Sequence, residues 1–180
     1  MTSSLTFSAA TLDDLDILID LETRSYAPDE AASPENLKRR ILAAQQTNHP
    51  ELLFMVARRQ ENPEEQKDVT TSLTIVGFIC CTVATSDLVT EESMSDNQPE
   101  GQTVCLHSVC VSPDTRHQGI ATALLTRWVG LHRQIRAYKR LALLSRPHLV
   151  ALYSSVGFKE IGISKVVHGP EPWVDCVLDL

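Results

Sequence analysis

The chain has 180 residues, of which 43% are hydrophobic and 22% charged, so it has the length and composition of one globular domain, residues 1–180, with a sizeable core. A formal charge of −7 argues against a nucleic-acid partner, which would select a basic surface, and favours a cationic small molecule. No apolar run approaches the roughly 20 residues that span a bilayer, and the start M-T-S-S-L-T-F lacks the basic and apolar regions of a signal peptide, so we expect a cytoplasmic protein without a membrane partner.

The N-terminal part is predicted to hold one strand and two helices. Phe7 to Ala10 suit a short strand, and Thr11 is a good N-cap for a helix over residues 12–25. The apolar positions of this helix are expected in the core: Leu12, Leu15, Leu18, Ile19 and Leu21. Ser33 suits the cap of a second helix that starts at Pro34 and runs to about residue 46.

Two further strands and an acidic segment follow. Leu52–Arg58 and Leu73–Thr82 are predicted strands, and the polar segment Gln60–Thr71 between them reads as an exposed hairpin loop. Asp87–Glu100 has almost no apolar residues but contains Glu91, Glu92 and Asp96. It is either a mobile acidic loop or a lid that steers an ammonium substrate into a site.

The strand over Thr103–Val111 is the centre of the predicted fold. Side chains of a strand alternate between its two faces. One face is predicted to carry Val104, Leu106, Ser108 and Cys110, and the other Cys105, His107, Val109 and Val111. A histidine and a cysteine therefore share a face.

A glycine loop and a long helix come after this strand. The helix is expected to run to Lys139, because apolar residues recur every three or four positions at Ile120, Leu124, Trp128, Leu131, Ile135 and Tyr138. Gly119 stands where it begins, and the free N–H groups and dipole of a helix start favour a phosphate or pyrophosphate. The nucleotide fingerprints G-x-x-x-x-G-K-[ST] and G-x-G-x-x-G are absent, so another phosphate-containing ligand is expected.

The C-terminal part is predicted to complete a mixed sheet. Leu141–Ser145 is a continuous apolar run, typical of a buried strand that pairs in parallel through a helical crossover. Pro147–Val156 suits a short helix, bracketed by proline at its start and Gly157 at its end. Phe158–Val167 and Trp173–Leu178 are predicted antiparallel strands joined through Gly169-Pro170.

The segment Arg116-His117-Gln118-Gly119-Ile120-Ala121 resembles the R/Q-x-x-G-x-G/A acetyl-CoA loop of the GNAT N-acetyltransferase superfamily, and Leu152–Phe158 looks like its tyrosine and G-F segment. This resemblance implies an α/β fold, in which a mixed central sheet has helices on both faces and a splayed parallel strand pair. It also implies acetyl-CoA as co-substrate and no metal. The residues implied to bind it are Val109, Cys110, Val111, Arg116, His117, Gln118, Gly119, Ile120, Ala121 and Thr122.

Within that superfamily, nearly the whole chain resembles the arylalkylamine N-acetyltransferases. Matching stretches include Glu22–Tyr26, Cys105–Gly119 and Leu149–Tyr153. Where that family has two histidines on the strand face, this chain has Cys105 and His107. The predicted fold runs from residue 7 to the last residue, so the phosphorylated regulatory tails of the vertebrate enzymes are expected to be missing.

The resemblance also implies roles for individual residues. His107 would accept the proton of the ammonium substrate, directly or through water, because imidazole titrates near neutrality. Cys105 would extend this proton path or serve as a small buried hydrophobic residue. Tyr153 would donate a proton to the departing CoA sulfur, and the N–H of Val109 would bind the acetyl carbonyl. The implied acceptor pocket is apolar and suits an aromatic ring: Tyr26, Pro34, Leu106 and Leu144.

The expected function is acetyl-CoA-dependent N-acetylation of an arylalkylamine such as tryptamine, serotonin or phenylethylamine, by direct transfer in a ternary complex. One alternative is a polyamine (spermidine or spermine) acetyltransferase, which would need several carboxylates at the pocket. Another is a non-catalytic CoA-binding regulatory module, in which residues such as His107 and Tyr153 would not be needed and should be absent.

The five cysteines are odd in number and lack metal-finger spacing, so reduced buried thiols are expected. We expect a monomer.

Overall fold

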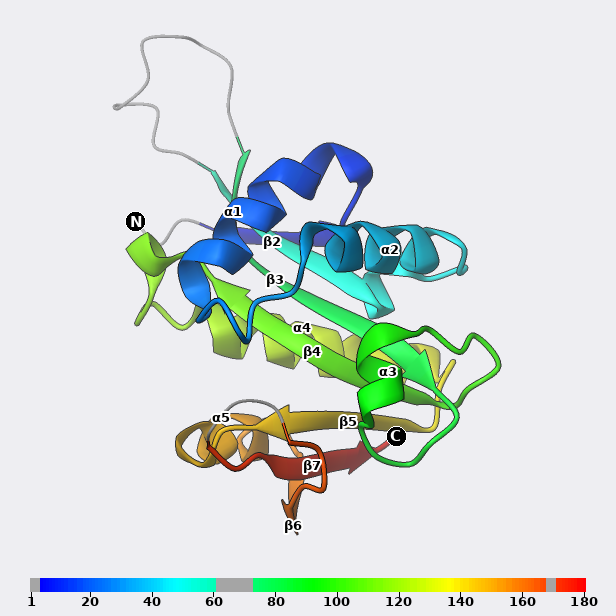
Figure 1. Ribbon diagram of the computed structural model, residues 1–180. Helices are drawn as coiled ribbons and strands as arrows, with labels where there is room; N and C mark the ends of the chain where they lie inside the picture. Colours follow the sequence, from blue (N-terminus) through cyan, green and yellow to red (C-terminus); the bar gives the residue numbers. More distant parts are fainter. Residues whose placement is uncertain (1–3, 61–72, 168–170) are drawn as a thin grey trace, which may run out of the picture.

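A computed structural model describes residues 4–60, 73–167 and 171–180. These residues form a seven-stranded sheet with the strand order β1-β2-β3-β4-β5-β7-β6 (Figure 1). The strands are β1 (Leu5–Ala9), β2 (Phe54–Gln60), β3 (Leu73–Ala84), β4 (Thr103–Val111), β5 (Arg140–Ser145), β6 (Lys159–Ile163) and β7 (Val174–Asp179). Neighbours in the sheet are antiparallel except β4 and β5, which are parallel.

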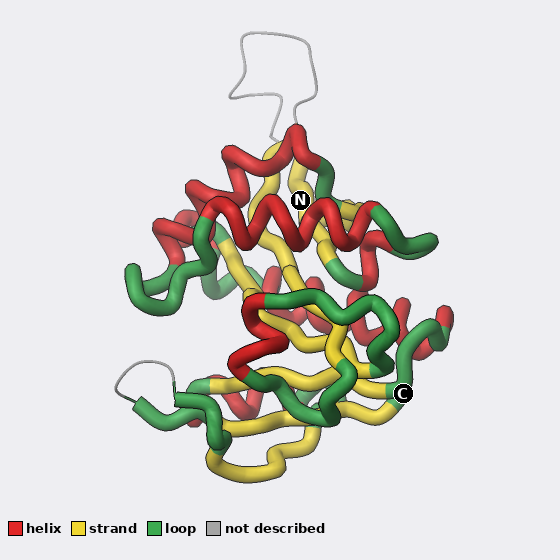
Figure 2. Tube along the Cα trace, turned by 45° about the vertical axis from the view of Figure 1, so that its right-hand side comes forward, coloured by secondary structure: helices red, strands yellow, loops and turns green. Residues whose placement is uncertain are grey.

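Helices cover both faces of this sheet. They are α1 (Leu15–Ser25), α2 (Pro34–Gln45), α3 (Glu91–Ser95), α4 (Ile120–Ile135) and α5 (Val150–Ser154). Helices α1 and α2 lie on one face and α4 on the other (Figures 1 and 2). The largest fully buried side chains are Trp128 of α4, Phe54 of β2 and Phe78 of β3. The predicted mixed α/β fold is confirmed, whereas the assignment of all 180 residues to one domain stays a prediction.

The parallel pair separates partway along its length, as predicted. Strand β4 pairs with β5 from Thr103 opposite Arg140 to Leu106 opposite Leu143, and the pairing stops there. Strand β5 continues to pair with β7 through Ser145. From His107 onward, β4 therefore has no paired strand on that side among the described residues, and a gap opens in the middle of the sheet.

Helix α2 begins where its capping residue predicts, whereas the helix expected directly after Thr11 becomes α-helical only at Leu15. Thr11 donates its backbone N–H to the Asp14 carboxylate over 2.9 Å, and a short 3-10 turn precedes α1. The Ser33 hydroxyl accepts the N–H of Asn36 at 3.2 Å and caps α2, with Pro34 in its first turn. One core prediction is wrong, because Leu12 lies in the 3-10 turn and is 40% exposed.

Several predicted elements have different bounds. Helix α4 ends at Ile135 instead of Lys139, because Arg136 adopts a left-handed conformation with φ 54°. The predicted helix over Pro147–Val156 starts as a 3-10 turn and is helical over α5, and the predicted strand over 158–167 is shortened to β6. The predicted hairpin loop beyond Gln60 and the Gly169-Pro170 connection lie outside the described residues.

The acidic segment over 87–100, expected to be either a mobile loop or a lid, contains the short helix α3 and contacts β3 and β4. Thr90 caps α3 by accepting the N–H of Ser93 at 3.1 Å, and Val89 is buried. The Thr82 hydroxyl of β3 donates to the carbonyl oxygen of Ser93 over 2.6 Å. The amide oxygen of Asn97 accepts the N–H of residue 83 at 2.8 Å. These contacts hold the segment against β3.

Candidate active site

A β-bulge in β4 decides which side chains meet at the gap. On β3, Cys80 is opposite Ser108 and Cys81 is opposite Leu106, so β4 has one extra residue, His107, between them. As a result, His107 and Ser108 line the same cavity. The predicted alternation, which placed these two side chains on opposite faces, is wrong at this point.

The His107 ring is held in one orientation by a chain of hydrogen bonds. Its Nε2 lies 2.8 Å from the Thr82 hydroxyl oxygen, and the Thr82 hydroxyl itself donates to the carbonyl of Ser93. Thr82 must then accept from His107, which assigns the proton to Nε2 and leaves Nδ1 as the acceptor. Burial, with the nearby Arg40 charge as second cause, lowers the pKa of His107 well below its ordinary value. His107 is therefore neutral at physiological pH and can accept a proton.

His107 lies where two cavities meet. The first, of about 390 Å³, is bounded by α1, α2 and α3, and we call it the α2 cavity. The second, of about 750 Å³, extends to the start of α4 and is called the α4 cavity. Both cavities are lined by Tyr26, Leu106, His107, Leu144 and Trp173, so a ligand in one can reach a ligand in the other.

Glu22 places a buried carboxylate in the α2 cavity. It lies on α1 and is 1% exposed. Its Oε1 accepts the N–H of Ala32 at 2.9 Å and the hydroxyl of Ser108 at 3.0 Å, while Oε2 is buried without a hydrogen-bond partner among the described residues. Burial raises the pKa of Glu22, although both hydrogen bonds and the charge of Arg40 oppose that shift. The free oxygen is suited to an ammonium group.

An arginine and a tryptophan lie together in the wall of the α4 cavity. The Arg146 guanidinium lies 3.8 Å from the ring centre of Trp173. Arg146 also forms an ion pair with Glu30 and donates to the carbonyl of Glu171 over 2.9 Å. This cluster connects the segment after α1 with the segment before β7, on opposite sides of the gap.

The start of α4 fits a phosphate group. Gly119 is the N-cap with φ 77°, and the preceding His117 has φ 62°, so the backbone turns sharply into the helix. A side chain at Gly119 would point into open space. The predicted cofactor residues that line the α4 cavity are Val109, Cys110, Val111, Arg116, His117, Gly119, Ile120, Ala121 and Thr122. Gln118 does not line this cavity, and its amide oxygen accepts a hydrogen bond from Arg59 at 2.8 Å.

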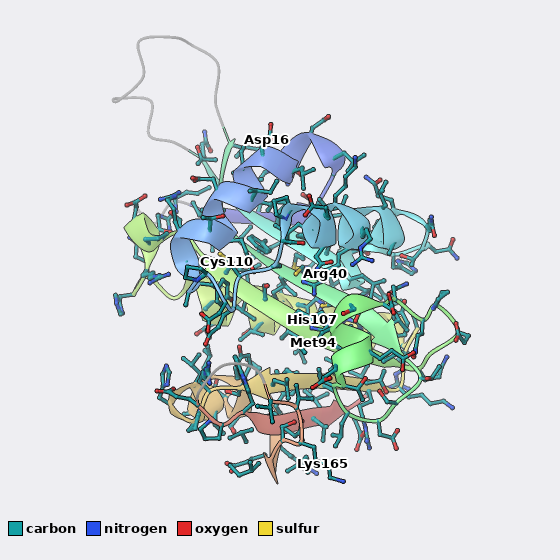
Figure 3. All side chains as sticks on the ribbon, in the orientation of Figure 1. Asp16, Arg40, Met94, His107, Cys110 and Lys165 are labelled. Atoms are coloured by element: carbon teal, nitrogen blue, oxygen red, sulfur yellow. The ribbon has the colours of Figure 1, made fainter. Side chains whose placement is uncertain are left out.

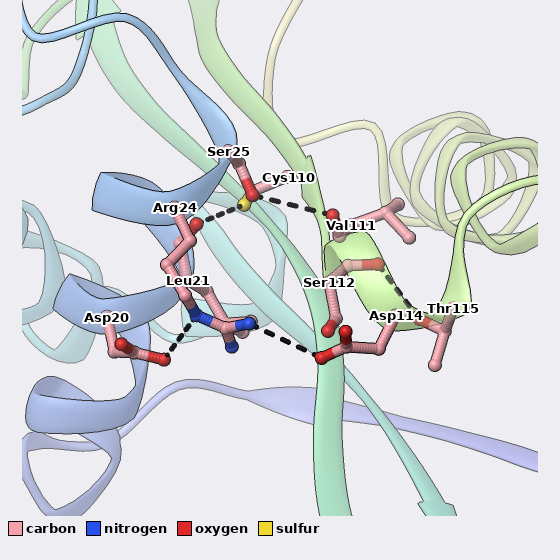
Figure 4. A network of polar contacts seen from close by, with 9 residues as sticks. All are labelled: Asp20, Leu21, Arg24, Ser25, Cys110, Val111, Ser112, Asp114 and Thr115. Atoms are coloured by element: carbon pink, nitrogen blue, oxygen red, sulfur yellow. Dashed lines mark hydrogen bonds and ion pairs between the residues drawn. The ribbon is translucent and has the colours of Figure 1, made fainter.

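The loop before α4 is anchored to the end of α1 (Figure 4). Arg24 donates to Asp20 over 2.8 Å and to Asp114 over 3.3 Å. The Cys110 thiol donates to the carbonyl of Leu21 over 3.4 Å. Helix α1, which carries Glu22, is thus fixed to the strand and loop that form the α4 cavity.

The gap between β4 and β5 exposes backbone groups of β4. The Tyr26 hydroxyl donates to the carbonyl oxygen of Val109 over 3.0 Å. In an extended strand the C=O and N–H of one residue point to the same side, so the Val109 N–H also faces the gap. Tyr153 of α5 lines the α4 cavity, and burial raises its pKa to about 12, which keeps the phenol protonated.

The structure brings most of the predicted site residues together, but not all. Cys105 lines neither cavity; it is fully buried with Ala84, Val89 and neighbouring apolar side chains, and burial raises the pKa of its thiol to about 11. Pro34 is exposed at the start of α2 and also lines neither cavity.

Sequence reasoning missed Glu22, Arg40 and Trp173. Glu22 and Arg40 fall on the buried faces of their helices, four residues after Leu18 and three after Leu37. A charged residue on an apolar stripe is the signal that would have identified both. In the part of the chain that the structure describes, no group of His, Cys, Asp and Glu side chains is arranged to hold a metal ion. None of the described helices is long and apolar enough to cross a membrane.

Comparison with known proteins agrees with this geometry. Residues 15–158 match the acetyltransferase (GNAT) family. Serotonin N-acetyltransferase of Mesocricetus auratus is 30% identical over 95 residues, which is 53% of this chain and 46% of that protein. The match therefore spans about half the length of this relative.

Solved structures share the fold at low sequence identity. The loading GNATL domain of CurA from Lyngbya majuscula is 16% identical with a TM-score of 0.74, and 98% of each chain is covered. The protein yncA of Salmonella typhimurium, solved with its cofactor acetyl-CoA, is 17% identical with a TM-score of 0.63, covering 98% of this chain and 94% of that one. Because the family match covers most of the sequence and includes β4, the glycine loop and α4, the chain belongs to the acetyltransferase (GNAT) family.

Proposed function

We propose that this protein transfers the acetyl group of acetyl-CoA to the primary amine of an arylalkylamine such as tryptamine, serotonin or phenylethylamine. The observation that carries the proposal is the meeting of two cavities at His107. The α4 cavity ends at a helix start suited to pyrophosphate, and the α2 cavity holds a buried carboxylate beside apolar side chains. Both substrates can then be bound together, and the acetyl group passes directly between them.

On the cofactor side, the N–H groups at the start of α4 would bind the pyrophosphate, with Arg116 and His117 nearby. The N–H of Val109 in the gap would donate to the thioester carbonyl oxygen and stabilise the negative charge that develops there. All of these groups line one continuous cavity.

On the acceptor side, we propose that Glu22 Oε2 holds the ammonium group and that Nδ1 of His107 takes its proton, directly or through water. The neutral amine attacks the carbonyl carbon, the carbon–sulfur bond breaks, and the CoA thiolate takes the Tyr153 hydroxyl proton, while the nitrogen, now bonded to the acetyl group, gives its extra proton to solvent and becomes the neutral amide. Solvent returns a proton to Tyr153, and His107 releases its proton to solvent. Cys105 has no part in this path, because it lines neither cavity.

The lining of the α2 cavity supports an aromatic acceptor. Leu106, Leu144, Val89 and Met94 supply apolar surface, and Trp173 supplies an aromatic ring. A specific observation also favours the polyamine alternative, since Glu22, Glu30 and Glu91 all line this cavity. However, Glu30 is paired with Arg146 and Glu91 is exposed, so Glu22 alone is both buried and unpaired by a cation.

The five cysteines are all free and buried, which supports a reducing compartment, and we propose the cytoplasm. If the protein were a non-catalytic CoA-binding module, His107 and Tyr153 would have no catalytic role, although both line the α4 cavity.

Two experiments test the proposal. Initial rates at varied acetyl-CoA and tryptamine should give intersecting double-reciprocal lines; parallel lines would indicate a covalent acetyl-enzyme and refute direct transfer. Glu22→Gln keeps the acceptor for Ser108 and Ala32 but loses the charge, so the KM for tryptamine should rise about 10- to 100-fold, the range of a charged hydrogen bond. Asp16→Asn, on the exposed side of the same helix, is the matched control and should change neither constant.

A further inference from the structure

The α2 cavity also contains a buried arginine for which the proposed reaction has no use. Arg40 lies on α2, is 8% exposed and lines this cavity. Figure 3 shows it beside His107 and Met94, where α2 and α3 face β4. Taking a guanidinium out of water is costly, so a buried arginine normally has a carboxylate or several hydrogen-bond acceptors around it.

The contacts of Arg40 satisfy its guanidinium only in part. Nη2 donates to the carbonyl oxygen of Met94 over 3.0 Å, and Nη1 lies 3.4 Å from the Sγ of Cys80, a weak acceptor. Among the described residues, no carboxylate lies within ion-pair distance of Arg40. A guanidinium has five N–H donors, so a cavity ligand with an oxygen atom would complete its shell.

The cavity therefore offers two buried charges of opposite sign. Glu22 on α1 and Arg40 on α2 both line it, and the charge of Arg40 acts on Glu22 although the two side chains form no ion pair. The cavity wall also has apolar side chains, among them Leu106, Val89 and Leu144. A ligand with an ammonium group, an apolar body and an oxygen acceptor matches this arrangement. A polyamine matches it poorly, because its second ammonium group would approach the Arg40 charge.

We propose that Arg40 is a specificity-determining residue that binds an oxygen of the amine substrate, either a ring hydroxyl or a carboxylate. The inference rests on the proposed function and narrows its substrate class to oxygen-bearing arylalkylamines. A hydrogen bond to a charged group makes the oxygen-bearing substrate better by about 10- to 100-fold in kcat/KM than its counterpart without that oxygen.

The test compares substrates that differ by one oxygen group. CoA release is measured for the wild type with serotonin against tryptamine and with tyramine against phenylethylamine, and with tryptophan against tryptamine for the carboxylate. The wild type should prefer at least one oxygen-bearing partner by about 10-fold or more. In Arg40→Met the ratio of the two kcat/KM values should fall to near one, because only the oxygen-bearing substrate loses a hydrogen bond. Arg40→Lys keeps the positive charge but loses the planar set of N–H donors of the guanidinium, so its ratio of kcat/KM values should lie between those of the wild type and Arg40→Met. It also serves as the test if Arg40→Met does not fold.

The ratios of kcat/KM between paired substrates separate the recognition of the substrate oxygen by Arg40 from the other effects of this residue. Arg40 also tethers α3 through Met94 and lowers the pKa of His107, but both effects act equally on all amines. Asn97→Ala, which removes the hydrogen bond to residue 83 from the same segment, is the control and should preserve the ratios. Equal kcat/KM values in the wild type, or unchanged ratios in both Arg40 variants, would overturn the inference. A wild type that releases no CoA with any of these amines would refute the proposed function itself, and this inference with it.

Discussion

Replacing His107 with glutamine should lower kcat for tryptamine acetylation by about 100-fold. Glutamine can still donate to the Thr82 hydroxyl, which lies 2.8 Å from His107 Nε2, so the chain to the carbonyl of Ser93 survives. What is lost is the basic Nδ1. General-base catalysis raises the rate of the chemical step roughly 10²- to 10⁴-fold. We expect the lower end of this range, because water and Glu22 can accept some of the protons when His107 is missing. A 100-fold loss corresponds to about 2.7 kcal/mol in the activation free energy.

The pH dependence of kcat makes this prediction sharper. Burial and the charge of Arg40 lower the pKa of His107 well below its ordinary value. The imidazole therefore stays neutral, and competent as a base, to more acidic pH than an exposed histidine would. In the wild type kcat should be flat through neutral pH and should fall only on the acidic side of the ordinary histidine range. In Arg40→Met one cause of the shift is removed, so this fall should move to higher pH.

The assay is thiol release from acetyl-CoA at saturating amine, measured from acidic to mildly alkaline pH. Cys105→Ala is the matched control: it changes a buried side chain on the same strand that lines neither cavity, and it should cost far less than His107→Gln. The double variant should behave like His107→Gln alone. If His107→Gln retains near-normal kcat and the same acidic fall, the proton leaves by another route and the assignment of His107 is refuted.

Three further predictions concern the cofactor site and the fold. Gly119→Glu should abolish acetyl-CoA binding in calorimetry with the circular dichroism spectrum unchanged, because a carboxylate at the helix start repels the pyrophosphate; retained binding would refute the loop assignment. Tyr153→Phe should lower the kcat plateau but leave the acidic fall in place; a shifted fall would mean that the phenol, whose pKa is about 12, is not the proton donor. The pKa of buried His132 is lowered from 6.5 to about 4, so the unfolded chain binds a proton first as pH falls. The free energy of unfolding should then drop by up to about 3 kcal/mol between these two pH values, and His132→Phe should remove that drop, as denaturant titrations can measure.

The fold was largely predictable because its central signals are local. The alternating strand over Thr103–Val111, Gly119 and the apolar stripe from Ile120 follow each other directly in the chain, and each depends on its own periodicity or backbone freedom. The splay of β4 from β5 came from the family resemblance alone, and the pairing that stops at Leu106 confirms it. The spacing of apolar residues predicts strands and helices, but it does not predict the residue at which two paired strands separate.

The site was predictable only in part because its geometry depends on contacts between distant segments. The bulge that brings His107 and Ser108 to one cavity arises from the register with β3, while β4 itself alternates without any local mark of an extra residue. Glu22 and Arg40 were read as ordinary helix residues, since their burial follows from how α1 and α2 pack on the sheet. The acidic segment folds because β3 supplies the Thr82 hydroxyl.

Thiol release by the wild-type protein with tryptamine, compared with spermidine under the same conditions, tests the proposed reaction most directly. The apolar α2 cavity with a single buried carboxylate predicts a kcat/KM at least about 10-fold higher for tryptamine, because each well-buried apolar group contributes about 1–3 kcal/mol of discrimination. A clear preference for spermidine would contradict the arylalkylamine assignment and favour the polyamine alternative. Acetyl-CoA binding without thiol release from either amine would contradict catalysis and leave a CoA-binding module.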